Sequence, residues 1–286
     1  MCASDTRDYR MLTTDAVLRA AVSGPREQLR LTLDPAFQGL PGAAHGGALL
    51  ALVDARASRT AAREVVGQYL RRVPVGVALV MREEDAGAGC RVLDTAGAVL
   101  LEGRVRPAAP PAAVATAPLT DAWSLPVSRG CFACGTDNAL GLHAQLAFDA
   151  EVVAGAWRVN PRFLREAGRL APVAVTTLLD EVAFWLGALA TGESGMTTEL
   201  RVTLADDAPV GDVVHVAGAR ADVRPRADDP RYWDTTVAAT GADGRCLASA
   251  RITFVGVRGA ARRLVAGLLE VNRADVVQRV FPAYCA

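Results

Sequence analysis

The chain has 286 residues, of which 51% are hydrophobic and 22% charged, and its formal net charge is zero. This length accommodates two domains with separate cores, and this composition is typical of a compact fold and excludes a disordered chain. A net charge of zero gives no reason to expect nucleic acid or an anionic membrane surface as a partner. All 31 basic residues are arginine, which together with frequent alanine is typical of a GC-rich bacterial genome.

The first 15 residues carry several charges and lack the apolar stretch of a secretory signal. No uninterrupted apolar run approaches the ~18 residues that a membrane span needs. We therefore expect a cytoplasmic protein without a membrane partner. In that compartment the cysteines are expected to be reduced thiols; they are Cys2, Cys90, Cys131, Cys134, Cys246 and Cys285.

The first half of the chain is predicted to begin with a short helix at 14–22 and a strand at 28–33. A loop rich in glycine and proline at 34–44 then leads into a helix at 46–58, whose apolar run is too continuous to show a single stripe. Turn residues separate four further strands. These strands are expected at 63–70, 75–82, 89–94 and 99–106.

The second half is predicted to repeat this order after a semi-rigid Pro/Ala segment at 107–118. Two strands, a helix and four more strands are expected at 142–148, 155–159, 173–191, 197–204, 213–224, 231–240 and 246–255. The tail at 259–286 is predicted to be helical and amphipathic. The domain boundaries that follow are 1–107 for the first domain, 108–128 for the linker, 129–258 for the second domain and 259–286 for the tail.

Each half contains a small-residue loop that runs into an apolar helix with one carboxylate at the same register. The first copy spans 41–54 and carries Asp54, and the second spans 170–181 and carries Asp180. A helix followed by an antiparallel meander that wraps around it makes an α+β unit. We therefore predict an α+β protein built from a duplicated unit. A strand ending in a Pro-Val-Gly turn lies beyond each helix, with the turns at 74–76 and 209–211.

Several short motifs occur in matching order in the two halves. They are His45-Gly46-Gly47 with Asp54, the segment 69–76, Cys131-Phe132-Ala133-Cys134-Gly135 with Asn138 and Gly141-Leu142, and the segment 178–181. Together they resemble the tandem, double-hotdog arrangement of the hotdog fold, and within it the acyl-CoA and acyl-carrier-protein thioesterases. The resemblance covers 28–106 and 130–256, and it implies two hotdog domains, each an antiparallel sheet wrapped around a central helix, that form a pseudo-dimer within one chain.

Hydrolysis of a thioester needs a group that polarises the carbonyl and either an activated water or a nucleophilic carboxylate. Gly46 and Gly47 stand at the predicted helix start, where free N–H groups and the helix dipole suit a developing oxyanion. Without a Cβ, glycine lets a thioester approach the backbone closely. His45 is expected to donate a further hydrogen bond or to fix the loop.

Asp54 lies eight residues after Gly46, about 12 Å away along one helix. The two therefore cannot act on the same carbonyl carbon. A working site must combine the glycines of one half with the carboxylate of the other, and the hotdog resemblance implies the same arrangement.

The first composite site combines His45-Gly46-Gly47 with Asp180 and is complete. We predict Asp180 as the base or the nucleophile, with Glu181 as an assistant or a substitute. Thr197 or Thr198 is expected to orient the water or the carboxylate, although both are also ordinary strand residues.

The mirrored site combines 171–173 with Asp54 and is expected to be inactive. Pro172 has no N–H, and Val173 blocks close approach to the backbone. The family position that often carries Ser or Thr, which the resemblance places at Thr197 in the second half, falls on Ala62 in the first. Asp54 is expected to remain as a structural carboxylate or as a substrate-binding residue at the rim of the site.

Other residues are candidates for binding the substrate. Phe184 lies one helical turn beyond Asp180, and with Trp185 it is predicted to line an acyl pocket, the alternative being ordinary core packing. Arg71 and Arg72, and in addition Arg201, are candidates for contacts with CoA.

The Cys131-X-X-Cys134 spacing invites a zinc site. No second cysteine pair has ligand spacing, and His143 and His215 do not complete the usual pattern. We therefore predict structural thiols and no metal. No cofactor is expected other than CoA or phosphopantetheine as part of the substrate.

The sequence thus predicts an acyl-CoA or acyl-carrier-protein thioesterase with one composite site. Two alternatives stay open: a hotdog dehydratase, isomerase or cyclase acting on a tethered acyl or polyketide chain, and a non-catalytic acyl-binding protein. The absence of a Gly-Asp-X-Asn-Pro segment disfavours a hydratase. Pairing of the halves lets a monomer function and leaves room for a homo-oligomer.

Overall fold

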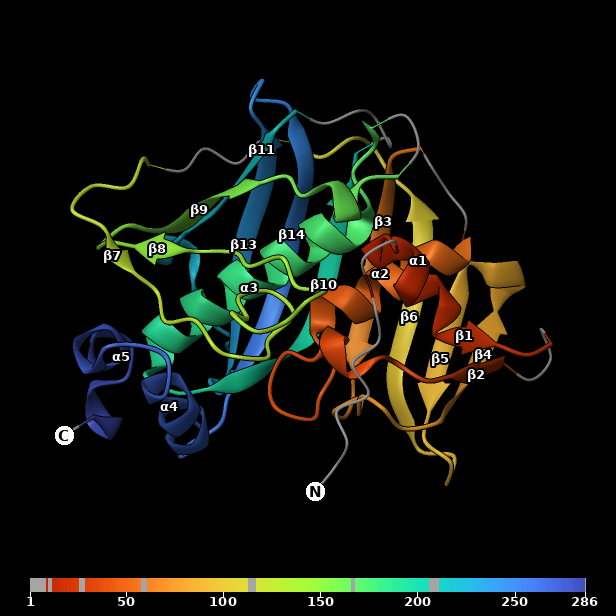
Figure 1. The fold of residues 1–286 in the computed structure, drawn as a ribbon, viewed down its shortest axis with the longest axis horizontal. Helices are drawn as coiled ribbons and strands as arrows, with labels where there is room; N and C mark the ends of the chain where they lie inside the picture. Colours follow the sequence, from red (N-terminus) through yellow and green to blue (C-terminus); the bar gives the residue numbers. More distant parts are fainter. Residues whose placement is uncertain are drawn as a thin grey trace.

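The computed structural model describes residues 9, 12–25, 29–57, 61–112, 117–165, 168–205 and 211–285. In these ranges the chain forms one 14-stranded antiparallel sheet with two central helices, α2 and α3, packed against it (Figure 1). This is the predicted α+β architecture, with two hotdog units joined edge to edge.

The first half follows the predicted order of elements. They are α1 (Thr14–Ala20), β1 (Val22–Ser23), β2 (Leu29–Leu31), α2 (Gly46–Ala57), β3 (Arg63–Tyr69), β4 (Leu79–Glu84), β5 (Gly89–Leu93) and β6 (Val99–Pro107). The strand predicted at 75–82 begins later, at Leu79, because Gly76 turns the chain with a φ of +69°. Before this turn, Pro74 forms an isolated bridge with Ala43, in the loop that leads into α2.

The second half also keeps the predicted order, with two differences. Its elements are β7 (Trp123–Ser124), β8 (Ala147–Phe148), β9 (Val152–Arg158), α3 (Pro172–Thr191), β10 (Gly195–Leu204), β11 (Val213–Ala219), β12 (Arg224–Pro225), β13 (Tyr232–Gly241) and β14 (Cys246–Gly256). The strand predicted at 142–148 shrinks to β8, because Leu142 and Ala144 donate their N–H groups to the Cys131–Cys134 loop instead of to a strand. The strand predicted at 213–224 is interrupted by a 3₁₀ turn at Arg220–Asp222.

Parts of several predicted features lie outside the described residues. They are Cys2, residue 28 of the first strand, residue 58 of the helix predicted at 46–58, residues 113–116 of the Pro/Ala segment, residues 209–210 of the second Pro-Val-Gly turn and residue 286 of the tail.

The two halves meet where β3 pairs with β10. This antiparallel ladder runs from Arg63 opposite Leu204 to Gln68 opposite Glu199. On the helix-facing side of β10, Leu200, Val202 and Leu204 are buried, which is the period-2 pattern of a strand with one face in the core. The joint makes a continuous sheet, in the strand order β1-β2-β4-β5-β6-β3-β10-β14-β13-β11-β9-β8-β7, and β12 pairs with β13 off this path.

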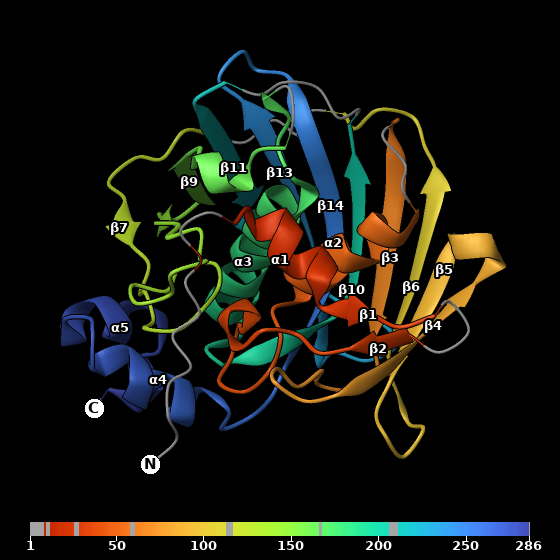
Figure 2. The ribbon, with the colours of Figure 1, turned by 45° about the vertical axis from the view of Figure 1, so that its right-hand side comes forward.

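The C-terminal tail covers one end of α3. Its helices α4 (Ala261–Leu269) and α5 (Ala274–Val280) lie beside the last turns of α3 (Figures 1 and 2). Phe281 is fully buried, with its ring 6.4 Å from that of Trp185. Asn272 forms two hydrogen bonds with the backbone of Val127, of 2.9 and 2.6 Å. The tail is therefore part of the second domain's core.

Among the described helices, α3 alone is long and apolar enough by composition to cross a membrane, and most of it is buried inside the fold. Its sequence contains Asp180 and Glu181 near the middle, which is why no uninterrupted apolar run marks it. Its burial is that of a core helix.

The first turn of α2 packs directly on the backbone of α3. A Cβ atom at Gly47 would lie 2.4 Å from the carbonyl oxygen of Thr176 and 2.5 Å from the Cα of Thr177. The hydroxyl of Thr176 donates a 2.8 Å hydrogen bond to the Gly47 carbonyl. Only glycine fits at this point of the contact between the two halves.

Replacing Gly47 with alanine is expected to lower the free energy of unfolding by about 2–3 kcal/mol, because the added methyl overpacks the helix contact. Chemical denaturation measures the effect. Gly267→Ala is the matched control: nothing lies within 4 Å of its new methyl, and alanine favours the helix there. Equal stability of the two variants would contradict this role of Gly47.

Candidate active site

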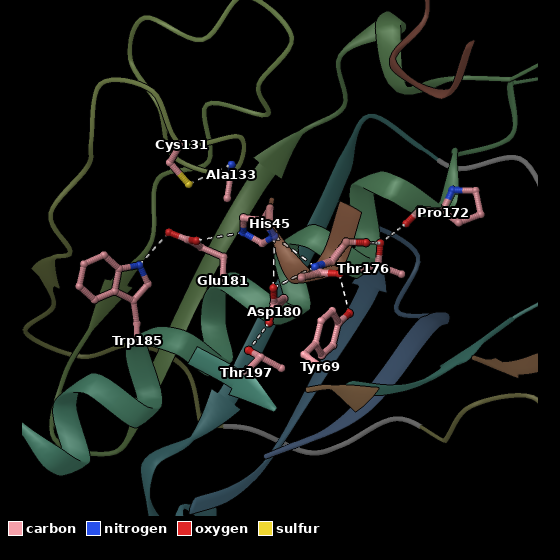
Figure 3. Close-up of polar contacts among 12 residues, drawn as sticks. His45, Tyr69, Cys131, Ala133, Pro172, Thr176, Asp180, Glu181, Trp185 and Thr197 are labelled. Carbon is pink, nitrogen blue, oxygen red and sulfur yellow. Dashed lines mark hydrogen bonds and ion pairs between the residues drawn. The ribbon is translucent and has the colours of Figure 1, made fainter. Parts of the chain in front are cut away.

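The predicted composite site forms between the two halves (Figure 3). The Gly47 N–H, at the start of α2, donates a 2.9 Å hydrogen bond to Oδ2 of Asp180, in the middle of α3. His45 Nδ1 lies 3.2 Å from the same oxygen. Asp180 and His45 are 5% and 6% exposed, so these contacts form away from bulk water, where they are strong.

The other oxygen of Asp180 is held by β10. The hydroxyl of Thr197 donates to Oδ1 at 2.6 Å, whereas the hydroxyl of Thr198 donates to the Thr253 carbonyl at 3.3 Å. A bulge in the β10–β14 ladder between Thr197 and Glu199 separates the two threonines. Of the two hydroxyls proposed from sequence, the structure brings only that of Thr197 to the carboxylate.

His45 lies between two carboxylates. Its Nε2 is 3.5 Å from Oε2 of Glu181, and Nδ1 faces Asp180. Burial opposes protonation, but the hydrogen bond with Glu181 and the charge of Asp180 outweigh it and raise the pKa of His45 to about 9. Nδ1 also lies 3.2 Å from the Gly47 nitrogen, so the imidazole packs against both the start of α2 and the Asp180 carboxylate and helps to fix the orientation of that carboxylate.

Glu181 is anchored on its other side by Trp185, whose Nε1–H donates to Oε1 at 2.9 Å (Figure 3). Trp185 is buried, and its ring packs edge-on to that of Phe184. Phe184 is partly buried and also contacts the ring of Phe254 edge-on, with centroids 6.0 Å apart. The structure thus gives Trp185 a polar partner at the site, in addition to the apolar role predicted for it.

Gly46, at the start of α2, offers an N–H group to the site, as its position in the sequence predicts. Among the described residues, no hydrogen-bond acceptor is found for its N–H. A Cβ on Gly46 would lie 2.7 Å from Oδ2 of Asp180. The lack of a side chain at Gly46 thus allows the Asp180 carboxylate to approach, and the lack of one at Gly47 allows the contact between α2 and α3. These roles add to the close approach of a substrate that the sequence predicts.

Tyr69 is a site residue that the sequence argument did not assign. Its hydroxyl donates a 2.7 Å hydrogen bond to the Gly46 carbonyl. Burial, with the charge of Asp180 nearby, raises the pKa of Tyr69 well above its usual value, so the phenol remains a donor. The only sequence signal was its place at the start of the motif at 69–76.

The Cys131–Cys134 loop of the second half closes over His45. The Phe132 N–H donates to the Gln38 carbonyl at 2.7 Å, and the amide of Asn138 donates to the carbonyls of Ala36 and Gly130. The Phe132 ring lies edge-on to His45, 6.4 Å away. This motif therefore joins the second half to the loop that precedes α2.

The two thiols of this loop are buried and contact each other. The hydrogen bond with Cys134 lowers the pKa of Cys131, and the same contact raises the pKa of Cys134. The Ala133 N–H also donates to the Cys131 sulfur, at 3.3 Å. Among the described residues, His45, Cys131 and Glu181 form the group whose ligand atoms lie close enough to share a metal ion.

Asp54, at the position in the first half that corresponds to Asp180, forms a different interaction. Both of its oxygens are bound by the guanidinium of Arg63, one at 2.8 Å from Nη2 and the other by Nε, and Asp54 is 2% exposed. The prediction that Asp54 binds substrate does not fit this arrangement, because a fully buried and paired carboxylate has no face toward a ligand. Sequence alone gave no signal that Arg63 is its partner.

At the mirrored position, α3 begins with Pro172, preceded by Ala171, which makes no side-chain cap. The carbonyl of Pro172 lies 2.9 Å from the Thr176 hydroxyl, which it shares with the Gly47 carbonyl. Pro172 and Val173 thus stand at the start of α3, whereas Gly46 and Gly47 stand at the start of α2.

Arg71 and Arg72 are exposed on the loop after β3. This loop lies next to the segment that leads into α2, since the Ala44 N–H donates to the Val73 carbonyl at 2.8 Å. The arginines thus lie on a loop next to the start of α2. Among the described residues, the ion pairs found for Asp180 and Glu181 are with His45 and not with these arginines. Arg201 instead pairs with Glu64, at 3.0 Å across the joint between the halves, and with Glu199.

Solved structures of low sequence identity share this fold. A candidate thioesterase II from Thermobifida fusca YX aligns over 86% of this chain and 100% of its own, with 18% identity and a TM-score of 0.59. A protein of unknown function with a hotdog fold from Alicyclobacillus acidocaldarius aligns over 84% and 96%, with 13% identity and a TM-score of 0.58. The dehydratase domain of RzxB from Pseudomonas fluorescens aligns over 83% and 98%, with 15% identity and a TM-score of 0.54.

No protein-family model matches the chain, and no curated protein matches it by sequence. At these identities the structural matches show the fold alone: the chain is a double hotdog. They include proteins described as thioesterases and others described as dehydratases, so the chemistry must be argued from the residues of the site.

Asp54→Ala is expected to lower the free energy of unfolding by about 3–5 kcal/mol, because it removes the carboxylate that balances the charge of the buried Arg63 guanidinium. The double variant Asp54→Leu, Arg63→Met removes both charges and is expected to recover most of the loss. Asp275→Ala, at an exposed ion pair with Arg273, serves as the control and should leave the denaturation midpoint unchanged. A single Asp54 variant as stable as this control would contradict a structural role.

Proposed function

We propose that the protein hydrolyses an acyl thioester, carried by CoA or by an acyl-carrier protein, at the composite site between its two halves. One observation carries the proposal: Asp180 of the second half lies 2.9 Å from the Gly47 N–H of the first half. A carboxylate and a helix N-terminus thus converge on one point, as thioester hydrolysis requires.

The start of α2 supplies the polarising group. A thioester carbonyl oxygen placed at the first turn of α2 would accept from the Gly46 N–H, and charge that develops on it would be stabilised by the helix dipole. The Gly47 N–H is bonded to Asp180 and holds this carboxylate beside the carbonyl carbon. Each glycine thereby has a separate task.

Asp180 performs the chemical step in one of two ways. As a base it takes a proton from water while the water oxygen attacks the carbonyl carbon, and the thiolate leaves and is then protonated. As a nucleophile it attacks the carbonyl carbon and displaces the thiolate, which is then protonated; water cleaves the resulting mixed anhydride to release the acid and restore the carboxylate. In both routes Thr197 and His45 keep the carboxylate in place, and they act as positioning residues.

A second candidate function is acid–base chemistry on the acyl chain, as in a dehydratase. It is favoured by the 3.2 Å contact of His45 with Asp180 across the two halves, since such a pair can remove one proton and deliver another. In this arrangement, however, Nε2 of His45 faces Glu181 and Nδ1 faces Asp180, so neither ring nitrogen is free to exchange a proton with a substrate. For this reason we prefer hydrolysis to dehydration as the function. Binding of acyl groups without turnover is the third alternative.

Asp180→Asn is expected to lower kcat for thioester hydrolysis by about 10²–10⁴-fold, the range that a positioned base contributes. Thiol release from short, long and aromatic acyl-CoA esters, and from an acyl-carrier-protein thioester, measures the effect. Because Asn keeps the shape of the side chain, its fold is expected to be normal and is checked by thermal melting. A folded Asp180→Asn variant with the wild-type rate would refute the proposal.

Thr197→Val is expected to lower kcat by about 10-fold or more, since it removes a hydrogen bond to a charged group. Thr198→Val is the matched control, because the neighbouring hydroxyl bonds to a backbone carbonyl instead. Equal rates for the two variants would show that the Thr197 contact has no part in the reaction.

A 3-hydroxyacyl-CoA substrate separates the two enzyme functions. A thioesterase releases free CoA thiol, whereas a dehydratase forms the conjugated enoyl thioester without thiol release; the two products are resolved by chromatography. We expect thiol release. Formation of the enoyl product alone would favour the dehydratase function, and binding without either product would favour a binding protein.

A further inference from the structure

Three buried side chains from separate segments meet at one side of the composite site. A ring nitrogen of His45, Sγ of Cys131 and a carboxylate oxygen of Glu181 all lie within 4.8 Å of one another. The residues are 6%, 7% and 5% exposed. They come from the loop before α2, the Cys131–Cys134 loop and α3, so the folded chain assembles a group that no local motif contains.

These three atoms have the chemistry of transition-metal ligands. Imidazole nitrogen, thiolate sulfur and carboxylate oxygen are the ligand types that bind Zn²⁺. Tetrahedral zinc with bonds of about 2.0–2.3 Å separates its ligand atoms by roughly 3.3–3.8 Å. The 3.5 Å between Nε2 of His45 and Oε2 of Glu181 is one edge of such a tetrahedron.

Each of the three side chains is oriented by a second hydrogen bond on its far side (Figure 3). Nδ1 of His45 faces Asp180 at 3.2 Å, and Oε1 of Glu181 accepts from Trp185 at 2.9 Å. The Cys131 sulfur accepts from the backbone N–H of Ala133 at 3.3 Å. Outer partners of this kind, a carboxylate behind a histidine above all, are typical of metal sites.

We propose that His45, Cys131 and Glu181 form a binding site for a divalent transition-metal ion, zinc in preference. Three protein ligands leave a fourth position for water, and the Cys134 thiol contacts Cys131. Zinc is not expected from the sequence, because no second cysteine pair has ligand spacing; in the fold, His45 and α3 provide the other two candidate ligands. Bound through Nε2, His45 keeps Nδ1–H toward Asp180, so the ion fixes the imidazole beside the composite site.

Metal binding by the full-length chain tests this proposal independently of any catalytic activity. The protein is freed of metal with a chelator under a reductant and is then titrated with Co²⁺ and with Zn²⁺. We expect one Co²⁺ per chain with the thiolate-to-cobalt charge-transfer absorption that a cysteine ligand produces. Zn²⁺ should displace the cobalt and raise the melting temperature.

Two ligand variants and two thiol controls assign the site. Cys131→Ser should abolish the charge-transfer band, and Glu181→Gln should weaken Zn²⁺ binding at least ~10-fold. Cys90→Ser, which alters a buried thiol in β5 outside the cluster, should change neither, and Cys134→Ser should keep the band. Melting of the metal-free variants verifies their folding.

Two results would overturn the proposal: a wild-type chain without stoichiometric binding, or an absorption band that survives Cys131→Ser. The wild-type titration alone decides the matter if a variant fails to fold.

Discussion

The structure depends on the close contact between the first turn of α2 and the backbone of α3. At Gly47 the two helices approach so closely that no side chain fits between them. The same contact brings the Gly47 N–H to Asp180 and the Thr176 hydroxyl to the Gly47 carbonyl. Packing of the two halves therefore also assembles the site, because Gly47 both permits the close helix contact and donates the hydrogen bond to the Asp180 carboxylate.

The duplicated halves use equivalent positions for different purposes. Asp180 is held by a backbone N–H, by Thr197 and by His45, all groups that leave a carboxylate oriented and able to react. Asp54, at the corresponding position of α2, is bound on both oxygens by a guanidinium. One helix carboxylate serves the candidate site and the other serves the core, which explains how a symmetric fold carries a single composite site.

Much of this arrangement could be predicted from the sequence, for reasons that particular residues make clear. The separation of Gly46 and Asp54 along one helix required a partner from the other half, and apolar runs and turn glycines located α2, α3 and most strands. The extent of β8 could not be predicted, since Leu142 and Ala144 bond to the Cys131–Cys134 loop instead of to a strand. Equally hidden were the partner Arg63 for Asp54, nine residues away, and the approach of Cys131 to His45, because contacts between side chains of separate elements leave no periodic pattern.

The most direct test of the central claim is the crystal structure of the protein with a non-hydrolysable ketone analogue of an acyl-CoA, in which a methylene group replaces the thioester sulfur. The account predicts the analogue's carbonyl oxygen within hydrogen-bonding distance of the Gly46 N–H and its carbonyl carbon next to the Asp180 carboxylate, with nothing bound at Asp54. An analogue bound at the Asp54 side, or away from the start of α2, would contradict the assignment of the site.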